Sequence, residues 1–240
     1  MAYSQITPII GQVQQGYFYQ PDTVQREILG TVIPGVDNYY GFGEFMYVQF
    51  PASAAVTQGQ VVVISGFGGA AGNSAAVASN AANTGRGIAV AFNAIASVAA
   101  VQYGWVQISG SAVIKATASV AAGVTFGIDA TTGGSVGTNS AGRQVLNAVS
   151  IAPSTFAVAK AATLVSGSPT INVANVDGVV VGFTVSGTGV SGTVTAIDPN
   201  NRTVTLSANA SAGGNSTVTF TATGFIVGQL NRSFLQGATT

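Results

Sequence analysis

The sequence contains no cysteine and no histidine among its 240 residues. Without cysteine, no disulfide can hold the fold and no thiol chemistry can occur. Without histidine, a Ser-His-Asp catalytic arrangement and every metal site that uses an imidazole ligand are excluded. We therefore expect a fold that is held by its hydrophobic core, with no cofactor.

Charged residues are also scarce. They make up 6% of the chain, and seven basic and seven acidic side chains give a formal net charge of zero, whereas ordinary soluble domains carry about 25% charged residues. A free monomer with so little charge repulsion tends to associate. The low charge favours a protein that works in an assembly over the alternative of a merely neutral surface. The scattered cations form no basic stripe, so we expect no binding to nucleic acid.

The few carboxylates give little support to catalysis. Asp129, Asp177 and Asp198 lie in turn-like contexts, where Asp commonly caps its own backbone. A glycosidase needs only two carboxylates held about 5 to 9 Å apart, so the scarcity of carboxylates does not by itself exclude catalysis. We expect that the protein is not an enzyme.

Three glycines, Gly187, Gly189 and Gly192, spell the GxGxxG pattern of dinucleotide-binding proteins. In those proteins a helix follows the glycines, whereas here residues 193–197 continue as a strand. We interpret the pattern as a β-turn.

Nothing in the sequence predicts a membrane or secreted protein. The interval between Arg86 and Lys115 carries no charge, but polar residues interrupt it and its period is that of strands. We therefore expect no transmembrane helix. The first ten residues lack a basic segment followed by an apolar one, so we expect no secretory signal there.

From Glu44 onward, large apolar residues alternate with small or polar ones, which is the two-residue period of β-strands. The glycine- and alanine-rich residues 66–83 predict a loop, residues 130–142 predict turns, and Gly110-Ser111 predicts a break between two strands. Residues 94–101 fit a helix or a strand equally well. The expected strands of this region are residues 44–50, 61–64, 88–92, 105–108, 112–117, 124–128 and 143–151.

This succession of strands resembles the capsid decoration, or cement, proteins of tailed bacteriophages. The likeness covers residues 44–150 and the closing residues 224–230, and its most specific piece is QYGWVQISGSAVIKA, Gln102 to Ala116. The resemblance implies a β-barrel or β-tulip-like fold, oligomers that are often trimers, and attachment to the outside of a capsid. It implies no catalytic residues.

Residues 163–223 read as a second, compact all-β unit of Thr- and Ser-alternating strands separated by turns. They resemble small β modules that recur in phage and bacterial surface proteins, and we expect a β-sandwich-like module. Because Phe225 to Leu230 again has the pattern of a core strand, we interpret the module as an insertion. The core domain would then comprise residues 44–162 and 224–240.

Residues 1–43 differ in composition from the rest of the chain. Their prolines and glycines disfavour a helix or a central strand and indicate an extended arm. Clustered aromatic rings are costly in water and are typical of interfaces, so we expect the arm to dock on a partner and to become ordered when it does. The alternative is that the rings pack back onto their own β domain. The predicted docking residues are Tyr17, Phe18, Tyr19, Tyr39, Tyr40 and Phe42.

The sequence therefore predicts a structural virion protein that decorates and stabilises the outer surface of a phage capsid as a homotrimer. Its partner would be the major capsid protein, and its location the capsid exterior, with the host cytoplasm during assembly. The alternative is a receptor- or glycan-binding adhesin in which the module carries the contact surface. Phe183 and Phe220, the module's only aromatic residues, sit in strand runs as core candidates, which weakens that alternative.

Overall fold

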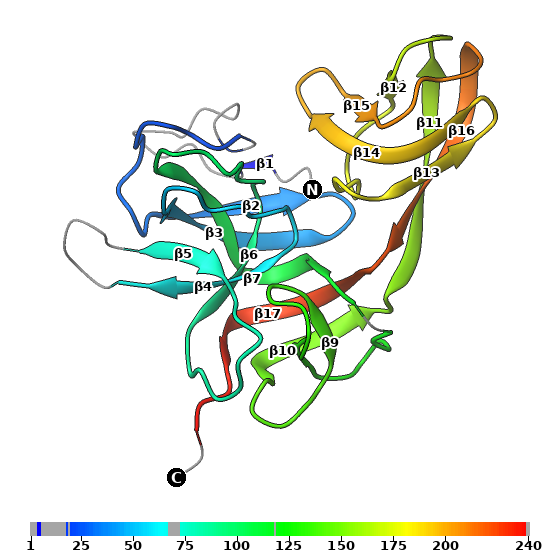
Figure 1. Cartoon of the computed structure of the whole chain (residues 1–240). Coiled ribbons are helices and arrows are strands. Elements are labelled where there is room, and N and C mark those ends of the chain that lie inside the picture. The colour runs from blue at the N-terminus through cyan, green and yellow to red at the C-terminus, as the bar shows by residue number, and fades with distance from the viewer. Residues whose placement is uncertain (1–3, 6–17, 19, 67–72, 118, 239–240) are drawn as a thin grey trace. The chain divides into compact units, whose positions relative to one another are not determined.

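The structure, a computed structural model, describes residues 4–5, 18, 20–66, 73–117 and 119–238 (Figure 1). In these residues the named elements are all β-strands, β1 to β17, which confirms the all-β class. The chain divides into two compact units. The module unit comprises Thr155–Thr223 together with Asp37–Tyr40, and the core unit comprises the described residues of Ser4–Val36, Gly41–Ser154 and Gly224–Thr240.

The core unit is built on one sheet with the strand order β1-β2-β3-β5-β4-β6-β7-β17-β10, and β8 and β9 form a separate pair. β17 lies between β7 and β10, so the chain returns to this sheet after the module, as the pattern of residues 225–230 predicted. The strands are β1 Ser4–Gln5, β2 Val32–Asp37, β3 Gly41–Phe50, β4 Val61–Ser65, β5 Ser74–Val77, β6 Ile88–Ala91, β7 Gln102–Lys115, β8 Phe126–Ile128, β9 Val136–Thr138, β10 Val145–Ala152 and β17 Phe225–Leu235.

Five of these strands close into a ring. β3 pairs with β5 at one end of the series β3-β5-β4-β6-β7 and with β7 at the other. Alternate residues of all five strands form one buried cluster, as expected for the interior of a small barrel. Closure of this kind is what the barrel-like expectation for the core domain requires. The members on these strands are Val48, Phe50, Val62, Ala75, Ala89, Ala91, Val106 and Ile108.

A second buried cluster lies on the other side of β4 and β6. Val61, Ile88 and Val90 alternate with the residues of the first cluster and pack with residues of β7, β8, β9, β10 and β17. Phe126 and Ile226 are fully buried there. The core unit therefore has two apolar layers that share the strands between them.

β7 contributes to both clusters because it runs unbroken through Gly110-Ser111, where the sequence predicted a break. Gly110 has a φ of +88°, which strains any other residue, and a Cβ there would overlap the backbone of Phe42 and Gly43. The glycine therefore allows β3 to approach a continuous strand instead of ending that strand.

Four strands lie where none was expected. β1 and β2 lie in the predicted arm, β5 in the predicted loop of residues 66–83, and β9 in the predicted turns of residues 130–142. β5 consists of Ser, Ala and Val and pairs along its whole length with β4, so its neighbour rather than its own hydrophobicity holds it. In residues 94–101 the structure has neither a helix nor a named strand.

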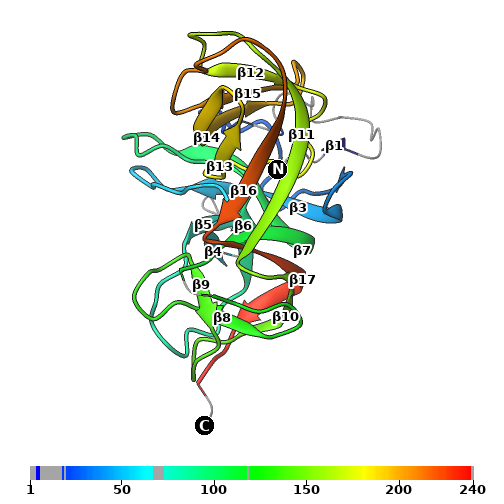
Figure 2. The ribbon, with the colours of Figure 1, turned by 90° about the vertical axis from the view of Figure 1, so that its right-hand side faces the viewer.

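The module unit is a closed six-stranded barrel in the order β11-β12-β15-β14-β13-β16, which replaces the sandwich-like arrangement that was expected (Figure 2). Phe183 and Phe220 are fully buried in it. β13 ends at Gly187 and β14 begins at Val190, so the GxGxxG pattern forms a hairpin, as interpreted. The strands are β11 Thr155–Leu164, β12 Thr170–Val173, β13 Thr184–Gly187, β14 Val190–Asp198, β15 Thr203–Leu206 and β16 Gly214–Thr223.

Candidate docking surface

Phe18, one of the predicted docking residues, lies in a buried aromatic cluster of the core unit. Its ring centroid is 4.6 Å from that of Phe92, 5.0 Å from that of Phe45 and 5.7 Å from that of Trp105, and its side chain is 1% exposed. Asn93 connects the same residues, since its Nδ2 donates to the Phe18 carbonyl (3.1 Å) and its Oδ1 accepts from the Trp105 amide (2.6 Å). Phe18 therefore packs back onto its own domain, as the alternative proposed.

Tyr40 is also buried, within the module unit. Its hydroxyl donates to the Gly178 carbonyl (2.8 Å), and its ring packs edge-on to Phe156. Tyr39 beside it is 50% exposed. Tyr17 and Tyr19 lie outside the described residues, so of the six predicted residues the structure leaves Tyr39 and Phe42 at the surface.

Asp22 fastens the segment that follows Phe18 to the sheet. Its backbone amide donates to the Tyr103 carbonyl and its carbonyl accepts from the Tyr103 amide, both at 2.8 Å. Its carboxylate accepts hydrogen bonds from Arg26 Nε (2.7 Å) and from the Tyr47 hydroxyl (3.3 Å). Burial, together with the nearby Asp22 charge, raises the pKa of Tyr47 to about 12. The described part of the predicted arm is therefore already anchored, whereas we expected it to become ordered on docking.

Exposed large apolar side chains gather in residues 24–42. Of the ten such side chains in the described residues, five lie in this short segment: Val24, Ile28, Val32, Tyr39 and Phe42. Tyr39 belongs to the module unit and the other four to the core unit. We call Val24, Ile28, Val32 and Phe42 the arm surface.

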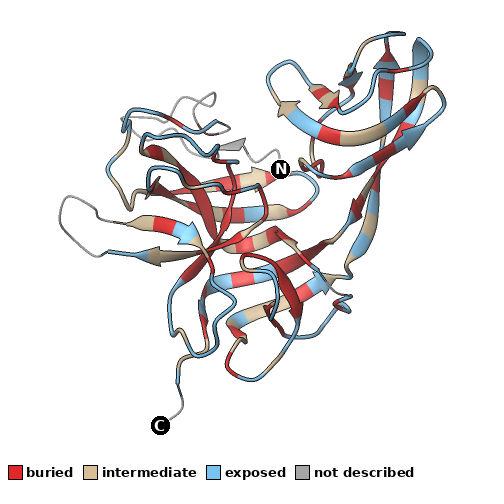
Figure 3. Ribbon diagram, viewed as in Figure 1, coloured by how far each residue is buried: buried red, intermediate tan, exposed pale blue. Residues whose placement is uncertain are grey.

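The strands β2 and β3 explain part of this exposure. Along both strands buried residues alternate with half-exposed or exposed ones (Figure 3). The Gly30 amide donates to the Tyr47 carbonyl and the Tyr47 amide to the Thr31 carbonyl, so the chain enters β2 beside Tyr47. The outward positions are Val32, Pro34 and Val36 on β2 and Phe42 and Glu44 on β3. Only Glu44 among them is charged, and Arg232 lies 3.4 Å from its carboxylate.

Sequence reasoning found Phe42 but missed Val24, Ile28 and Val32. Val24 stands alone between polar residues, and Ile28 is followed only by Leu29, so neither belongs to an apolar period that would mark it. The neighbouring charged residues Arg26 and Glu27 could have indicated their exposure, because they mark this segment as solvent-exposed. The prediction instead favoured the aromatic residues Phe18 and Tyr40, whose rings are buried in the core unit and in the module unit, respectively.

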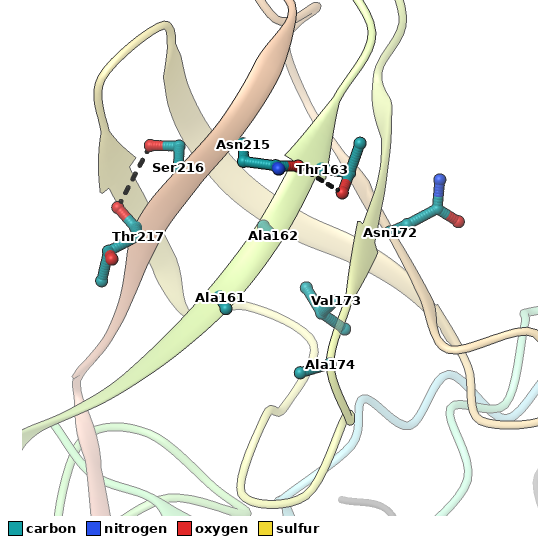
Figure 4. Close-up of a pocket in the computed structure, with 9 residues that line it drawn as sticks. All are labelled: Ala161, Ala162, Thr163, Asn172, Val173, Ala174, Asn215, Ser216 and Thr217. Carbon is teal, nitrogen blue, oxygen red and sulfur yellow. Dashed lines mark hydrogen bonds between the residues drawn. The ribbon is translucent and has the colours of Figure 1, made fainter.

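The module unit carries a second surface feature, a hollow of 580 Å³ over β11, β12 and β16 (Figure 4). Neither a charged nor an aromatic side chain lines it. Its lining residues are Ala161, Ala162, Thr163, Asn172, Val173, Ala174, Asn215, Ser216 and Thr217.

No protein-family model, no curated protein and no solved structure matches this chain. Among the described residues, no three acidic side chains gather as a metal site would require. The same part of the chain contains no helix long and apolar enough to span a bilayer.

Proposed function

We propose that the protein is a structural virion protein that binds the outer surface of a phage capsid and stabilises it, with the major capsid protein as its partner. The observation that carries the proposal is that half of the ten exposed large apolar side chains of the described residues fall within residues 24–42 of a nearly uncharged chain. Exposed apolar surface of this kind is typical of protein interaction sites. The resemblance of Gln102 to Ala116 to capsid decoration proteins supports the choice of partner.

The arm surface offers a modest binding energy per protomer. Val24, Ile28 and Phe42 are 67%, 80% and 52% exposed, so each still has half or more of its surface to bury. Full burial of such a side chain contributes about 1.5 to 3 kcal/mol. The freedom lost on association costs about 4 to 15 kcal/mol, which offsets most or all of the sum over these side chains. Firm attachment therefore needs several arm surfaces on one oligomer, and the trimer that the resemblance implies would supply them.

The anchoring of the arm on the core unit also favours binding to the capsid. Phe18 and Asp22 already hold the described part of the segment on the core unit. Docking then avoids the cost of fixing a free backbone, which is about 1 to 2 kcal/mol per residue. The backbone of the arm surface is thus ordered before docking. The apolar contacts then contribute to affinity without that entropy cost.

The test is binding to capsids assembled from the major capsid protein of the same phage. Full-length protein is added below saturation, and the copies per particle are counted by quantitative gel and by electron cryomicroscopy. We expect hundreds of copies on the head for the native chain and at least a tenfold lower occupancy for the double variant Val32→Ser/Phe42→Ser.

The control is Val165→Ser, which changes an apolar residue of the module unit that is 55% exposed, about as exposed as Phe42 (52%) and more exposed than Val32 (36%). It should bind like the native chain, and circular dichroism should show all three proteins folded. Unchanged occupancy of the double variant would refute the role of the arm surface. A few copies confined to the tail tip would refute capsid decoration itself.

A further inference from the structure

The hollow on the module unit is formed by two rows of side chains that cross three neighbouring strands. Thr163 of β11 lies opposite Asn215 of β16 and opposite Asn172 of β12. Neighbouring strands are about 4.8 Å apart, so these three side chains form a polar row about 10 Å long. In the sticks of Figure 4 this row lies along one side of the hollow.

The next outward row consists of small side chains. Ala161 lies opposite Thr217 of β16, and its carbonyl accepts a hydrogen bond from the Ala174 amide (3.0 Å) on the β12 side. The methyl groups of Ala161 and Ala174 occupy positions that longer side chains would fill. Their small size leaves the hollow beside the polar row. Its volume of 580 Å³ lies within the range of about 300 to 1,000 Å³ that is typical of small-molecule sites.

The polar row presents both donors and acceptors. The Thr163 hydroxyl donates to Asn215 Oδ1 (2.9 Å), which leaves the Asn215 side-chain amide hydrogens and both lone pairs of the hydroxyl oxygen for other partners. For the exposed side-chain amide of Asn172, no hydrogen bond is found within the described part of the chain. Adjacent hydroxyl groups of a sugar each donate and accept, so they match such a row, while the two alanine methyl groups provide an apolar floor for the C–H face of a pyranose ring.

The lining also selects by charge. None of the nine lining residues is ionisable. The nearest cation along β11, Lys160, is held by Asn175 Oδ1 at 2.6 Å. A carboxylate, sulfate or phosphate would find no ionic partner in the hollow, and a flat aromatic ligand would find no ring on which to stack.

We propose that this hollow binds a neutral polysaccharide through one or two of its pyranose units. Because alanine methyl groups take the place of an aromatic platform, a single site binds weakly, and several module units on one assembly would raise the apparent affinity. This inference is independent of capsid docking, since it concerns the other unit and is tested on the isolated protein.

The test is affinity electrophoresis of the full-length protein in gels that contain dextran, yeast mannan or a linear β-1,3-glucan, followed by NMR titration with oligosaccharides of the retarding polymer. We expect retardation by at least one of these neutral polymers. We expect Asn215→Ala and Asn172→Ala each to weaken binding about tenfold or more. Ala161→Gln fills the hollow without adding charge and should abolish binding.

The control is Asn209→Ala, an exposed asparagine of the same unit that does not line the hollow. It should bind like the native chain, and thermal unfolding should show that all variants keep the native fold. The proposal is overturned if none of the neutral polymers retards the protein, if Ala161→Gln binds like the native chain, or if an acidic polymer such as alginate binds more strongly than the neutral ones.

Discussion

Replacing Phe18 with alanine tests whether this ring belongs to the core or to a partner. The ring is 1% exposed and lies within 6 Å of three other aromatic rings, measured between centroids. Truncating a fully buried Phe to Ala costs about 3 to 5 kcal/mol, because apolar burial is lost and a cavity remains. In a chain of this size each kcal/mol lowers Tm by about 2 to 4 °C, so the unfolding transition of the core unit should fall by about 6 to 20 °C.

Trp105 makes the measurement specific. It is the only tryptophan, it is fully buried, and it belongs to the same aromatic cluster. Its fluorescence therefore reports unfolding of the core unit in a denaturant titration, and we expect a lower denaturation midpoint and an altered native emission in the variant. Phe18→Leu, which keeps most of the volume, should lose less than half as much stability.

The opposite result would refute the assignment. If Phe18→Ala leaves both the midpoint and the Trp105 emission unchanged but lowers occupancy on capsids, the ring is a docking residue after all. Loss of stability with unchanged occupancy, measured below the new Tm, confirms that Phe18 serves only the core.

Three further variants, one of them with a control, test the polar contacts. The pKa of Tyr47 in the folded state is raised to about 12, above its ordinary value of about 10. The protonated Tyr47 hydroxyl therefore contributes its full share to the free energy of unfolding below pH 10, and this contribution is lost as the pH rises toward 12. Tyr47→Phe has no such hydroxyl, so its free energy of unfolding, measured with urea, should fall less than that of the native chain between pH 10 and pH 12. Tyr40→Phe removes the hydrogen bond to Gly178 and should cost about 0.5 to 1.5 kcal/mol in the module unit, whereas the half-exposed Tyr39→Phe should be neutral. Hydrogen bonds from the backbone and side chain of Asn201 lower the pKa of Asp198, so its contribution is present above about pH 4 and is lost on further acidification; Asp198→Ala should lack that acid-dependent loss in thermal scans.

Four of the five strands that enclose the barrel, β3, β4, β6 and β7, were predictable because large apolar residues mark each of them in the local sequence. Val48 and Phe50, Val62 and Ile64, and Val106 and Ile108 each point inward from alternate positions, and the cluster in the structure joins these positions across the ring. The two-residue period marks which residues share a face. It cannot say which strands are neighbours, so ring closure through β3 and β7, 50 and more residues apart, became evident only in the structure.

The sequence misjudged β5 and the arm for a different reason. Ala75 is fully buried, yet an alanine surrounded by serine and alanine carries almost no hydrophobic signal, and pairing with β4 decides its structure. Phe18 is separated from Phe92 and Trp105 by more than 70 residues, and the residues around Phe18 do not predict that these rings contact it. Composition correctly indicated that aromatic rings need burial, but not whether their own domain or a partner buries them.

The module unit shows why the insertion of residues 163–223 is an incomplete account. The turn Asp37–Tyr40 belongs to the same unit, and there the Asp37 carboxylate accepts hydrogen bonds from the Tyr40 amide (3.0 Å) and the Gly178 amide (3.3 Å). Asp37 is fully buried, and excision of the barrel would remove the Gly178 amide from its carboxylate. The same excision would take the Gly178 carbonyl and the Phe156 ring away from Tyr40. An independent insertion would cost its host nothing when removed, whereas this barrel includes four residues supplied by the chain more than 100 positions earlier. The module unit is therefore completed by a segment that the sequence analysis assigned to the arm. A deletion of the barrel must also replace the turn Asp37–Tyr40 if the remaining chain is to keep no buried group without its partner.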